Sequence, residues 1–540
     1  MAGIHRSAWV LVLLSAALQI LIFPLPGLYW LSWLAFAPLI VALLRTRTPP
    51  TLQLKTSPHL LPARPWQGFL LGYMSGILWF AGTCYWVFET MHQYGGLSHL
   101  VAFVVLLAFC CYVGLYHGIF GFLIALTVGR SSSLRALAAA PFLWVAVELA
   151  RTRITGFPWN LLGTVQVDNV PLTRVATIAG VYGLSFEIML VNTALAAAFV
   201  VRKEKRKFLL IASLGAAVVL QAGRWLSLPP AATDHNALLV QQNIPISHGT
   251  PWTREYFEGT LRDLSWISTK PPVVSSDQKF GLIVWPESPA PFFSNDPFYL
   301  RALAGVAQQT HAWMISGAIG IDSEHSTSGQ EPRAYNSALL VTPEGQVGAR
   351  YDKVHLVPFG EYVPFRGMLP FMDMLTKEVG DFERGKSRIP FQAGDEKIGT
   401  FICYESIFPD EVRQFANHGA QVLVNTSNDG WYGDSGAYAQ HLQQTRMRAV
   451  ENSRWLLSAT NTGVTASIDP FGRVTARAER KMRTVLVASY MLSAETTFYT
   501  RHGDWFAFLC VIISLVAILI AQFSKPKAST TNVGRTGTGI

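Results

Sequence analysis

The chain has 540 residues, of which 50% are hydrophobic and only 14% are charged, and its mean hydropathy is +0.28. Soluble proteins carry about 25% charged residues, so this composition excludes an ordinary soluble protein and predicts a membrane protein with a sizeable soluble domain. The net charge of +9 does not indicate nucleic-acid binding, because much of the basic excess lies in short loops between apolar segments. The five cysteines form no CxxC pair and the histidines no HExxH motif, which argues against structural zinc and zincin sites.

Apolar segments in chain order predict eight transmembrane helices, near 9–24, 28–45, 67–88, 99–127, 135–150, 175–201, 208–227 and 504–523. Most approach or exceed the roughly 20 residues that cross a bilayer core. The first has features of a signal peptide, with Arg6 before an apolar run. Because so many spans follow, we expect it to remain as an uncleaved helix.

Lysine and arginine gather in every second loop, which predicts the orientation of the spans. The basic loops follow the second, fourth, sixth and eighth segments and contain Arg45, Arg47, Lys55, Arg64, Arg130, Arg135, Arg202, Lys203, Lys205, Arg206, Lys207, Lys525 and Lys527. The positive-inside rule makes this side cytoplasmic, although Arg151, Arg153 and Arg174 are exceptions. We therefore expect a membrane domain at 1–228 with seven spans, an outward domain at 229–500, a final transmembrane helix at 501–524 and a disordered cytoplasmic tail at 525–540.

The outward segment has the pattern of an α/β domain. Expected strands are Ala237–Gln242, Leu282–Trp285, Trp313–Ser316, Ser337–Val341, Ile398–Cys403, Val422–Asn425 and Thr484–Tyr490. The runs at 343–345 and 469–472 predict turns between strands, and Tyr438–Trp455 predicts a helix. A length of about 270 residues can bury a full core as one domain.

Three reactive side chains stand at or just beyond predicted strand ends. They lie in Trp285-Pro286-Glu287-Ser288, in the stretch Tyr351–Glu361, which contains Lys353, and in Phe401-Ile402-Cys403-Tyr404-Glu405-Ser406. Cys403 is the only cysteine of the outward domain and has no local disulfide partner there. It is therefore either a small buried hydrophobic residue or a nucleophile.

These residue types fit acyl transfer through a thiol. A thiolate attacks a carbonyl far better than a thiol, so Cys403 needs a base or a depressed pKa. Glu287 can take the proton, and Lys353 can favour the thiolate and stabilise the oxyanion. A helix expected near Ser406 would favour negative charge at the sulfur, and the Tyr404 N–H is a natural second oxyanion donor. A papain-like pair with His355 or His441 as base is an alternative.

The ordered set of stretches resembles the nitrilase superfamily, and most closely its membrane-embedded branch, the apolipoprotein N-acyltransferase family. The stretches that carry this resemblance, besides the three above, are Val240–Pro245, Asn425–Gly433, Gln440–Leu442, Arg448–Glu451, Ala459–Gly463, Thr155–Asn160 and Gly180–Ser185. Each is weak alone, but their order is specific. The resemblance covers nearly all of the chain except the tail and residues 46–65.

The resemblance implies a polytopic helical membrane domain plus an extracytoplasmic nitrilase-like αββα sandwich. It implies Glu287 as general base, Lys353 as oxyanion stabiliser and Cys403 as nucleophile. It also implies support from Glu361, Tyr404 and Glu405, and an acyl-chain or loop role for Trp252. Trp431 and the apolar segment Phe365–Leu375 are further candidates for guiding acyl chains, the latter as a lid or as ordinary core.

Structural roles compete with several of these assignments. Glu361 is equally a carboxylate that holds Lys353, and Glu405 is more simply a buried acceptor that orients the nucleophile loop. Tyr404 can pack without any chemical role. Arg448 and Glu451 stand three residues apart on a predicted helix and suggest a structural ion pair. His441 is expected to be a satisfied core histidine.

The implied activity moves an acyl chain from a membrane phospholipid, through a Cys403 thioester, to the α-amine of the N-terminal S-diacylglyceryl-cysteine of apolipoproteins. No metal or other cofactor is expected, and the implied location is the bacterial inner membrane with the outward domain on its periplasmic side. One rival is a membrane-tethered nitrilase-like hydrolase of small amides or nitriles. Another is a transporter, for which Glu148 and Glu187 are the main intramembrane candidates.

Overall fold

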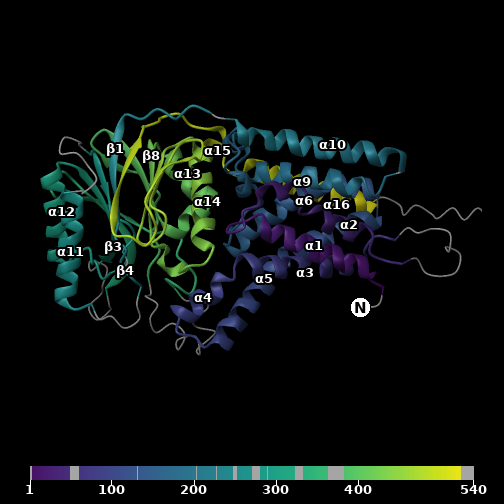
Figure 1. Cartoon of the computed structure of the whole chain (residues 1–540), viewed down its shortest axis with the longest axis horizontal. Coiled ribbons are helices and arrows are strands. Elements are labelled where there is room, and N and C mark those ends of the chain that lie inside the picture. Colours follow the sequence, from purple (N-terminus) through teal and green to yellow (C-terminus); the bar gives the residue numbers. More distant parts are fainter. Residues whose placement is uncertain are drawn as a thin grey trace, which may run out of the picture.

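The computed structural model describes residues 3–48, 60–130, 132–201, 203–226, 228–246, 252–270, 280–288, 290–322, 332–362 and 382–523. Two units stand side by side in Figure 1. One, the helical half, comprises α1 to α10 and α16; the other, the α/β domain, comprises the twelve strands with α11 to α14. The predicted lid at Phe365–Leu375 and the predicted tail at 525–540 lie outside the described residues.

Helices occupy all eight predicted apolar segments. The helical half contains α1 (Arg6–Leu21), α2 (Ala37–Leu44), α3 (Pro65–Thr83), α4 (Trp86–Gln93), α5 (His99–Arg130), α6 (Ser133–Ala150), α7 (Val170–Thr173), α8 (Ala176–Ala179), α9 (Val181–Ala197), α10 (Lys203–Ala222) and α16 (Trp505–Phe523). Among the described residues, four helices are long and apolar enough to cross a membrane, or up to six if each bent pair is one span. The prediction of eight full spans is thus supported only in part. Hydropathy reads composition, whereas α1 and the stretch Tyr29–Leu44 are apolar but shorter than 18 residues.

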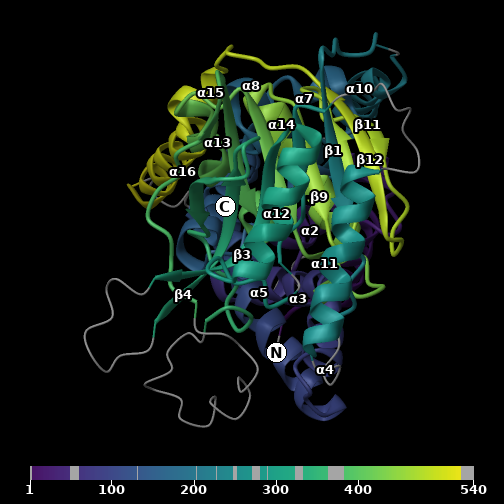
Figure 2. The ribbon, with the colours of Figure 1, turned by 90° about the vertical axis from the view of Figure 1, so that its left-hand side faces the viewer.

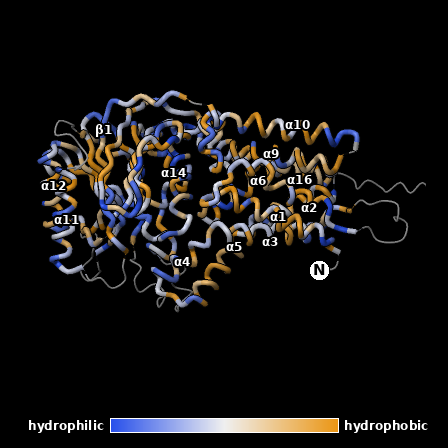
Figure 3. Tube along the Cα trace, in the orientation of Figure 1, coloured by the Kyte–Doolittle hydropathy of each residue, from blue (hydrophilic) through white to orange (hydrophobic). Residues whose placement is uncertain are grey.

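Hydrophobic residues predominate along the helices of the helical half, as the hydropathy colouring in Figure 3 shows. Large hydrophobic side chains face outward on α5, α10 and α16, where Leu100, Ile211 and Phe523 are 73%, 71% and 85% exposed. Water disfavours so continuous an apolar surface, whereas a bilayer accommodates it. By composition and by the direction of their side chains, these helices are candidates for membrane spans.

Close backbone contact joins α3 to α5. A Cβ atom added to Gly68 would lie 2.4 Å from the carbonyl oxygen of Gly121, and one added to Gly72 would lie 2.2 Å from that of His117. Only glycine fits at such a distance. Small residues at four-residue spacing are a common means of packing helices where lipid removes the hydrophobic driving force.

The α/β domain contains two six-stranded sheets, in the orders β12-β1-β2-β3-β4-β5 and β11-β10-β9-β8-β7-β6. The strands are β1 (His235–Gln241), β2 (Leu282–Val284), β3 (Trp313–Asp322), β4 (Arg333–Val341), β5 (Val347–Asp352), β6 (Phe391–Ala393), β7 (Glu396–Ile402), β8 (Val422–Ser427), β9 (Leu456–Thr460), β10 (Ala466–Ile468), β11 (Val474–Arg477) and β12 (Thr484–Tyr490). All seven predicted strands are confirmed. The predicted turns at 343–345 and 469–472 join β4 to β5 and β10 to β11.

Helices cover both outer faces, which gives a four-layer αββα sandwich. α11 (Arg254–Thr269) and α12 (Pro297–Thr310) lie on the first sheet (Figure 2), and α13 (Pro409–Asn417) and α14 (Ala437–Asn452) lie on the second. Successive side chains of β1 point to opposite faces: Leu239 packs between the sheets, and Leu238 and Val240 pack toward α11 and α12. The α13 and α14 layer faces the helical half (Figure 1).

A polar seam joins the two units along α14. The indole N–H of Trp159 donates to the side-chain oxygen of Gln440 at 2.6 Å, and the Gln440 amide donates to the carbonyl oxygens of Pro24 and Thr83, each at 3.0 Å. Glu451 accepts the backbone N–H of Val181 at 2.9 Å. The contact thus holds the second sheet and its strand ends in a defined position against the helical half.

Candidate active site

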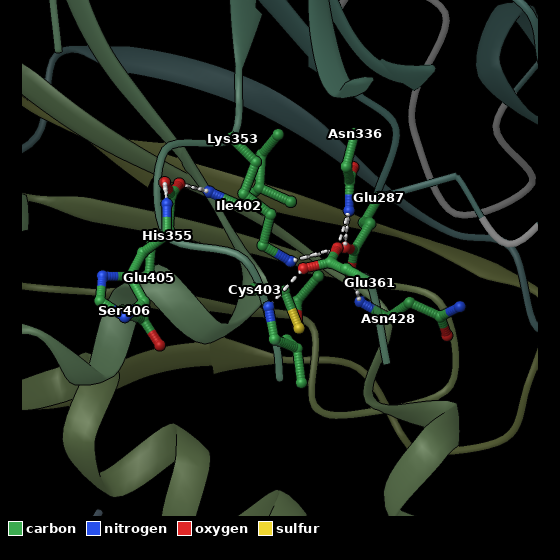
Figure 4. A network of polar contacts seen from close by, with 12 residues as sticks. Glu287, Asn336, Lys353, His355, Glu361, Ile402, Cys403, Glu405, Ser406 and Asn428 are labelled. Atoms are coloured by element: carbon green, nitrogen blue, oxygen red, sulfur yellow. Dashed lines mark hydrogen bonds and ion pairs between the residues drawn. The ribbon is translucent and has the colours of Figure 1, made fainter. Parts of the chain in front are cut away.

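The three reactive side chains of the sequence analysis meet at the ends of strands from both sheets. Glu287 follows β2, Lys353 follows β5, and Cys403 follows β7. Since β2 and β5 belong to one sheet and β7 to the other, packing the sheets face to face brings these ends together. Figure 4 shows the Glu287, Lys353 and Cys403 side chains gathered in one place, with Glu361 beside them.

Lys353 is the centre of a buried ionic cluster. Its ammonium nitrogen lies 3.2 Å from Oε1 of Glu287 and 2.8 Å from Oε1 of Glu361, and its side chain is only 1% exposed. Burial alone lowers the pKa of Lys353, but the two carboxylates outweigh burial and raise this pKa above its ordinary value. Lys353 is therefore a fixed ammonium group throughout the physiological pH range.

Glu287 is oriented from both of its carboxylate oxygens. Oε1 accepts from the Asn336 amide at 2.7 Å in addition to Lys353, and Oε2 accepts the backbone N–H of Asn428 at 2.8 Å. Asn336 also donates to Glu361, whose second oxygen accepts the backbone N–H of Val357 at 2.7 Å. The sequence carried no signal for Asn336, which lies inside β4, whereas Asn428 lies in one of the family-like stretches.

Cys403 stands at a sharp turn at the end of β7. Its φ of +50° lies in the left-handed region that side chains other than glycine rarely adopt, and its backbone N–H donates to Oδ1 of Asn425 at 3.1 Å. The helix expected near Ser406 is α13, which begins at Pro409, and a 3₁₀ helix spans Cys403–Ile407 before it. A single 3₁₀ turn adds little to any helix dipole at the sulfur.

Cys403 is buried, with 6% of the whole residue exposed, and the raised pKa of its thiol favours the protonated form. Burial raises its pKa well above the ordinary value and the Glu287 carboxylate raises it further, whereas Lys353 acts in the opposite direction. The cluster thus holds a neutral thiol next to both a potential proton acceptor and a fixed cation.

Glu405 lies on the other side of the turn and binds only donors (Figure 4). Oε1 accepts from the Tyr351 hydroxyl at 2.8 Å and from the backbone N–H groups of Val354 and His355 at 2.7 and 3.1 Å. Oε2 accepts the N–H of Ile402 at 2.8 Å. One carboxylate thus ties the Lys353 loop to the residue that precedes Cys403.

The remaining predicted residues lie at different distances from this centre. Tyr404 is buried, and its hydroxyl donates to the carbonyl of Gly156 in the helical half at 3.2 Å. Trp431 is 43% exposed, and its carbonyl accepts from Thr90 of α4 at 3.0 Å. Trp252 contacts the ring of Tyr256 in α11 at a tilt and the ring of Phe292 in a T-shaped arrangement, and its described contacts do not join it to Cys403.

His441 is a buried and fully hydrogen-bonded histidine, as predicted. Nδ1 lies 3.0 Å from Oδ1 of Asp429, and Nε2 lies 3.1 Å from the carbonyl oxygen of Cys403 and 2.7 Å from the Ser406 hydroxyl. Both nitrogens are therefore engaged away from the thiol, which argues against the papain-like alternative for His441. His355 faces Glu411 and Phe408 instead. Arg448 and Glu451 form the predicted ion pair at 3.0 Å.

One set of potential metal ligands is found among the described residues. Donor atoms of Cys403, Asp429 and His441 all lie within 4.8 Å of one another. The histidine nitrogens and the aspartate oxygen already bind each other and neighbouring hydroxyl and carbonyl groups. We therefore assign the set to the hydrogen-bond network behind the nucleophile, not to a metal centre.

Comparisons with known proteins cover both units. Residues 237–497 match the carbon-nitrogen hydrolase family, and residues 15–194 match the apolipoprotein N-acyltransferase N-terminal domain. An apolipoprotein N-acyltransferase of Geobacter metallireducens is 34% identical over 96% of this chain and 96% of its own, and one of Pseudomonas putida is 32% identical over 85% and 89%. Among solved structures, an amidase from Nesterenkonia sp. AN1 matches half of this chain and 97% of its own at 19% identity, with a TM-score of 0.35.

The chain matches two family models, a nitrilase-type domain and the N-terminal domain of one acyltransferase family. Both matches agree with the fold. In that fold, a buried cysteine, lysine and glutamate meet beside an apolar helical half. The two relatives align with this chain over most of their length. The chain belongs to the apolipoprotein N-acyltransferase family.

Proposed function

We propose that this protein transfers a fatty acyl chain from a membrane phospholipid to the N-terminal α-amine of S-diacylglyceryl-cysteine in apolipoproteins, with Cys403 as the covalent carrier. The observation that carries the proposal is the contact of Lys353 with Glu287 at 3.2 Å beside the Cys403 thiol, in a chain whose other half has an apolar surface. A thiol with a base and a fixed cation fits acyl transfer, and the apolar surface fits a lipid donor.

In the first step, Glu287 takes the proton of the Cys403 thiol while the sulfur attacks an ester carbonyl of the phospholipid. The carbonyl oxygen becomes an oxyanion that Lys353 and the backbone N–H of Tyr404 stabilise. The ester C–O bond then breaks, and the leaving alkoxide takes the proton from Glu287. A lysophospholipid departs, and the acyl chain remains as a thioester on Cys403.

In the second step, the amine of the acceptor attacks the thioester carbonyl and gives a proton to Glu287. The C–S bond breaks, the amide forms, and the sulfur recovers its proton from Glu287. This is a ping-pong cycle in which each half returns the same thiol and the same carboxylate.

The charges of the resting site suit this cycle. Lys353 faces the carboxylates of Glu287 and Glu361, so a thiolate formed without proton transfer to the site would add a further negative charge to a buried cluster. Moving the proton from sulfur to Glu287 keeps the total charge constant and leaves the thiolate beside the ammonium group. The thiol is therefore activated only when Glu287 accepts its proton, which limits wasteful reaction with water.

The setting of the proposed reaction is the bacterial inner membrane. The helical half spans the bilayer, both termini lie in the cytoplasm, and the α/β domain lies on the periplasmic side. Trp431, next to α4, and the loop with Gly156, next to Tyr404, stand where the two units meet. We assign this border as the region through which acyl chains reach Cys403.

Mass spectrometry of the purified full chain tests the proposal. After incubation with a phospholipid that carries one distinctive acyl chain, the peptide containing Cys403 is expected to gain the mass of that chain, and Cys403→Ala is expected to abolish the adduct. Addition of an S-diacylglyceryl-cysteine peptide with a free amine should remove the adduct and yield the amide. Blocking that amine by acetylation is the matched control and should leave the thioester in place.

Two outcomes would contradict the proposal. Amide formation that persists in Cys403→Ala would exclude the cysteine as carrier. A protein that forms no adduct with phospholipid but hydrolyses a short amide, in a manner that depends on Cys403, would instead be a membrane-tethered hydrolase.

A further inference from the structure

His441 occupies a position behind the nucleophile in which both of its ring nitrogens face acceptors. Nδ1 lies 3.0 Å from a carboxylate oxygen of Asp429, and Nε2 lies 3.1 Å from the carbonyl oxygen of Cys403. Neither a carboxylate nor a carbonyl oxygen can donate, so each contact is a hydrogen bond only if the nitrogen carries a proton. A neutral ring has one such proton and would leave one of these oxygens facing a lone pair. The Ser406 hydroxyl, 2.7 Å from Nε2, can accept as well as donate.

The surroundings of the ring also suit a cation. The indole of Trp159, from the helical half, lies parallel to the His441 ring, with 3° between the planes and 6.1 Å between the centroids. The Tyr432 and His441 rings form a T-shaped pair, with 63° between the planes and 5.8 Å between the centroids. Aromatic faces attract a positive charge most strongly where water is absent, and the His441 side chain is only 2% exposed. The Ser427 hydroxyl donates to Asp429 at 2.7 Å and so supports the ionised carboxylate.

We propose that His441 is a positioning residue, held as an imidazolium between Asp429 and the carbonyl of Cys403, which fixes the nucleophile turn and places a second positive charge near the sulfur. The inference rests on the proposed role of Cys403 as nucleophile but not on the identity of the acyl donor or acceptor. The left-handed backbone of Cys403, with a φ of +50°, is a conformation that needs such an external restraint.

Among the described residues, four charged or titratable groups lie around the ring. They are Asp429 and Tyr432 beyond β8, Cys403 at the end of β7, and Glu287 at the end of β2. Burial alone lowers the pKa of His441, but Asp429 and the Cys403 carbonyl outweigh burial and raise this pKa above its ordinary value. The Asp429–His441 pair is then neutral as a whole, with one charge of each sign within 4.8 Å of the sulfur.

The pH dependence of Cys403 alkylation tests this assignment without any lipid substrate. The full chain in detergent is treated with iodoacetamide over a series of pH values, and the modified Cys403 peptide is quantified by mass spectrometry. His441→Gln removes the positive charge but leaves Asp429 ionised, so the thiol pKa should rise by roughly one to three pH units. Alkylation below that pKa should slow about tenfold for each unit.

Asp429→Asn gives the matched comparison. If the native site holds an imidazolium, this change removes one charge of each sign, because the ring loses both its counterion and its proton. The alkylation profile should then stay close to that of the unaltered chain. With a neutral ring, the same change would remove only a negative charge, and alkylation would become faster. The double variant should resemble Asp429→Asn under the proposal.

The outcomes separate the two states of the ring. An unchanged profile in His441→Gln together with faster alkylation in Asp429→Asn would overturn the proposal. If His441→Gln does not fold, as judged by thermal unfolding, the isosteric Asp429→Asn decides alone: an unchanged profile supports the imidazolium, and faster alkylation contradicts it. Loss of Cys403 alkylation at every pH in the unaltered chain would count against the proposed nucleophile itself, so failure of the two proposals can be told apart.

Discussion

Both units of the molecule bury ionised side chains, but these side chains contact different kinds of polar group. In the α/β domain, the ammonium group of Lys353 faces the carboxylates of Glu287 and Glu361 beside a thiol. In the helical half, Arg151 donates to the carbonyl oxygens of Phe157 and Trp159 at 3.1 and 2.6 Å. Charges that face one another near a reactive atom are arranged for chemistry, whereas a charge that faces backbone groups fixes the path of a loop.

The two arrangements meet where the units touch. The loop that Arg151 holds presents Gly156 to the Tyr404 hydroxyl and Trp159 to the His441 ring, and both partners adjoin Cys403. The second buried charge of this region, Glu148, accepts the backbone N–H of Leu162 at 2.8 Å. Because Glu148 holds backbone, it gives no support to the transport hypothesis. The helical half therefore positions parts of the site, in addition to presenting an apolar outer surface.

Of the changes that distinguish the two units, replacing Lys353 by Met should have the largest effect on acylation. The change removes the fixed cation beside the thiol and the main donor to the oxyanion, so formation of the acyl-enzyme should slow by about 10²- to 10³-fold. The measurement is the rate at which the Cys403 peptide gains the acyl mass. A rate within a few-fold of the unaltered chain would mean that Lys353 only balances the charge of the two carboxylates.

Replacing Arg151 by Met is the matched change in the helical half, because it also removes a buried cation and keeps most of the side-chain volume. It leaves the carbonyls of Phe157 and Trp159 without their donor, and each unsatisfied group costs about 1–3 kcal/mol. We expect a lower melting temperature and a roughly tenfold slower acylation, equivalent to about 1.4 kcal/mol. Acylation as slow as in Lys353→Met, with an unchanged melting temperature, would contradict a role in positioning alone.

These two units also differ in how far their parts could be predicted. Glu287, Lys353 and Cys403 were predicted because reactive groups near strand ends gather in an α/β fold and because the three occur in the order of the nitrilase superfamily. The positions of these three residues in the sequence do not predict Asn336, which lies in the middle of β4 and bridges two carboxylates. A residue that contributes one amide to a cluster leaves no periodic or motif signal.

For the helical half, the sequence predicted the segments but not the bends between them. Hydropathy located every apolar segment, because a bilayer selects composition directly. It did not locate the breaks that divide α3 from α4 by 53° and α8 from α9 by 119°, since bends depend on backbone geometry and packing. It also gave no role to Arg151, which was only an exception in a loop until its carbonyl partners were known.

Glu405 in the α/β domain and Glu148 in the helical half allow a second matched comparison, with a smaller expected effect. The two oxygens of Glu405 accept four donors, so an amide in Glu405→Gln must turn its NH₂ toward at least one N–H group, at a cost of about 1–3 kcal/mol in the free energy of unfolding. Glu148→Gln keeps an oxygen for the single backbone N–H of Leu162 and should change that free energy by less than about 1 kcal/mol. Thermal or chemical unfolding of both variants measures the difference. Equal effects would show that the number of donors does not decide the cost.

The smallest effect concerns pH at the contact between the units. The pKa of His441 is raised in the folded protein, although burial alone would lower it, because Asp429 favours the charged ring. The folded state therefore holds this proton more tightly than the unfolded state, whose histidine has the ordinary pKa of 6.5. The stabilisation is fully present below 6.5 and is lost as the pH rises through the folded value.

The melting temperature should consequently fall with rising pH above 6.5 more steeply in the unaltered chain than in Asp429→Asn, in which the ring has no counterion. The difference between the two curves isolates His441 from every other group that titrates in the same range. Trp159→Leu, made in the helical half, removes the aromatic face that the ring stacks on and should reduce the same difference. If it leaves the difference untouched, the helical half holds the nucleophile turn through Gly156 and Tyr404 alone, and the two units are coupled by one contact instead of two.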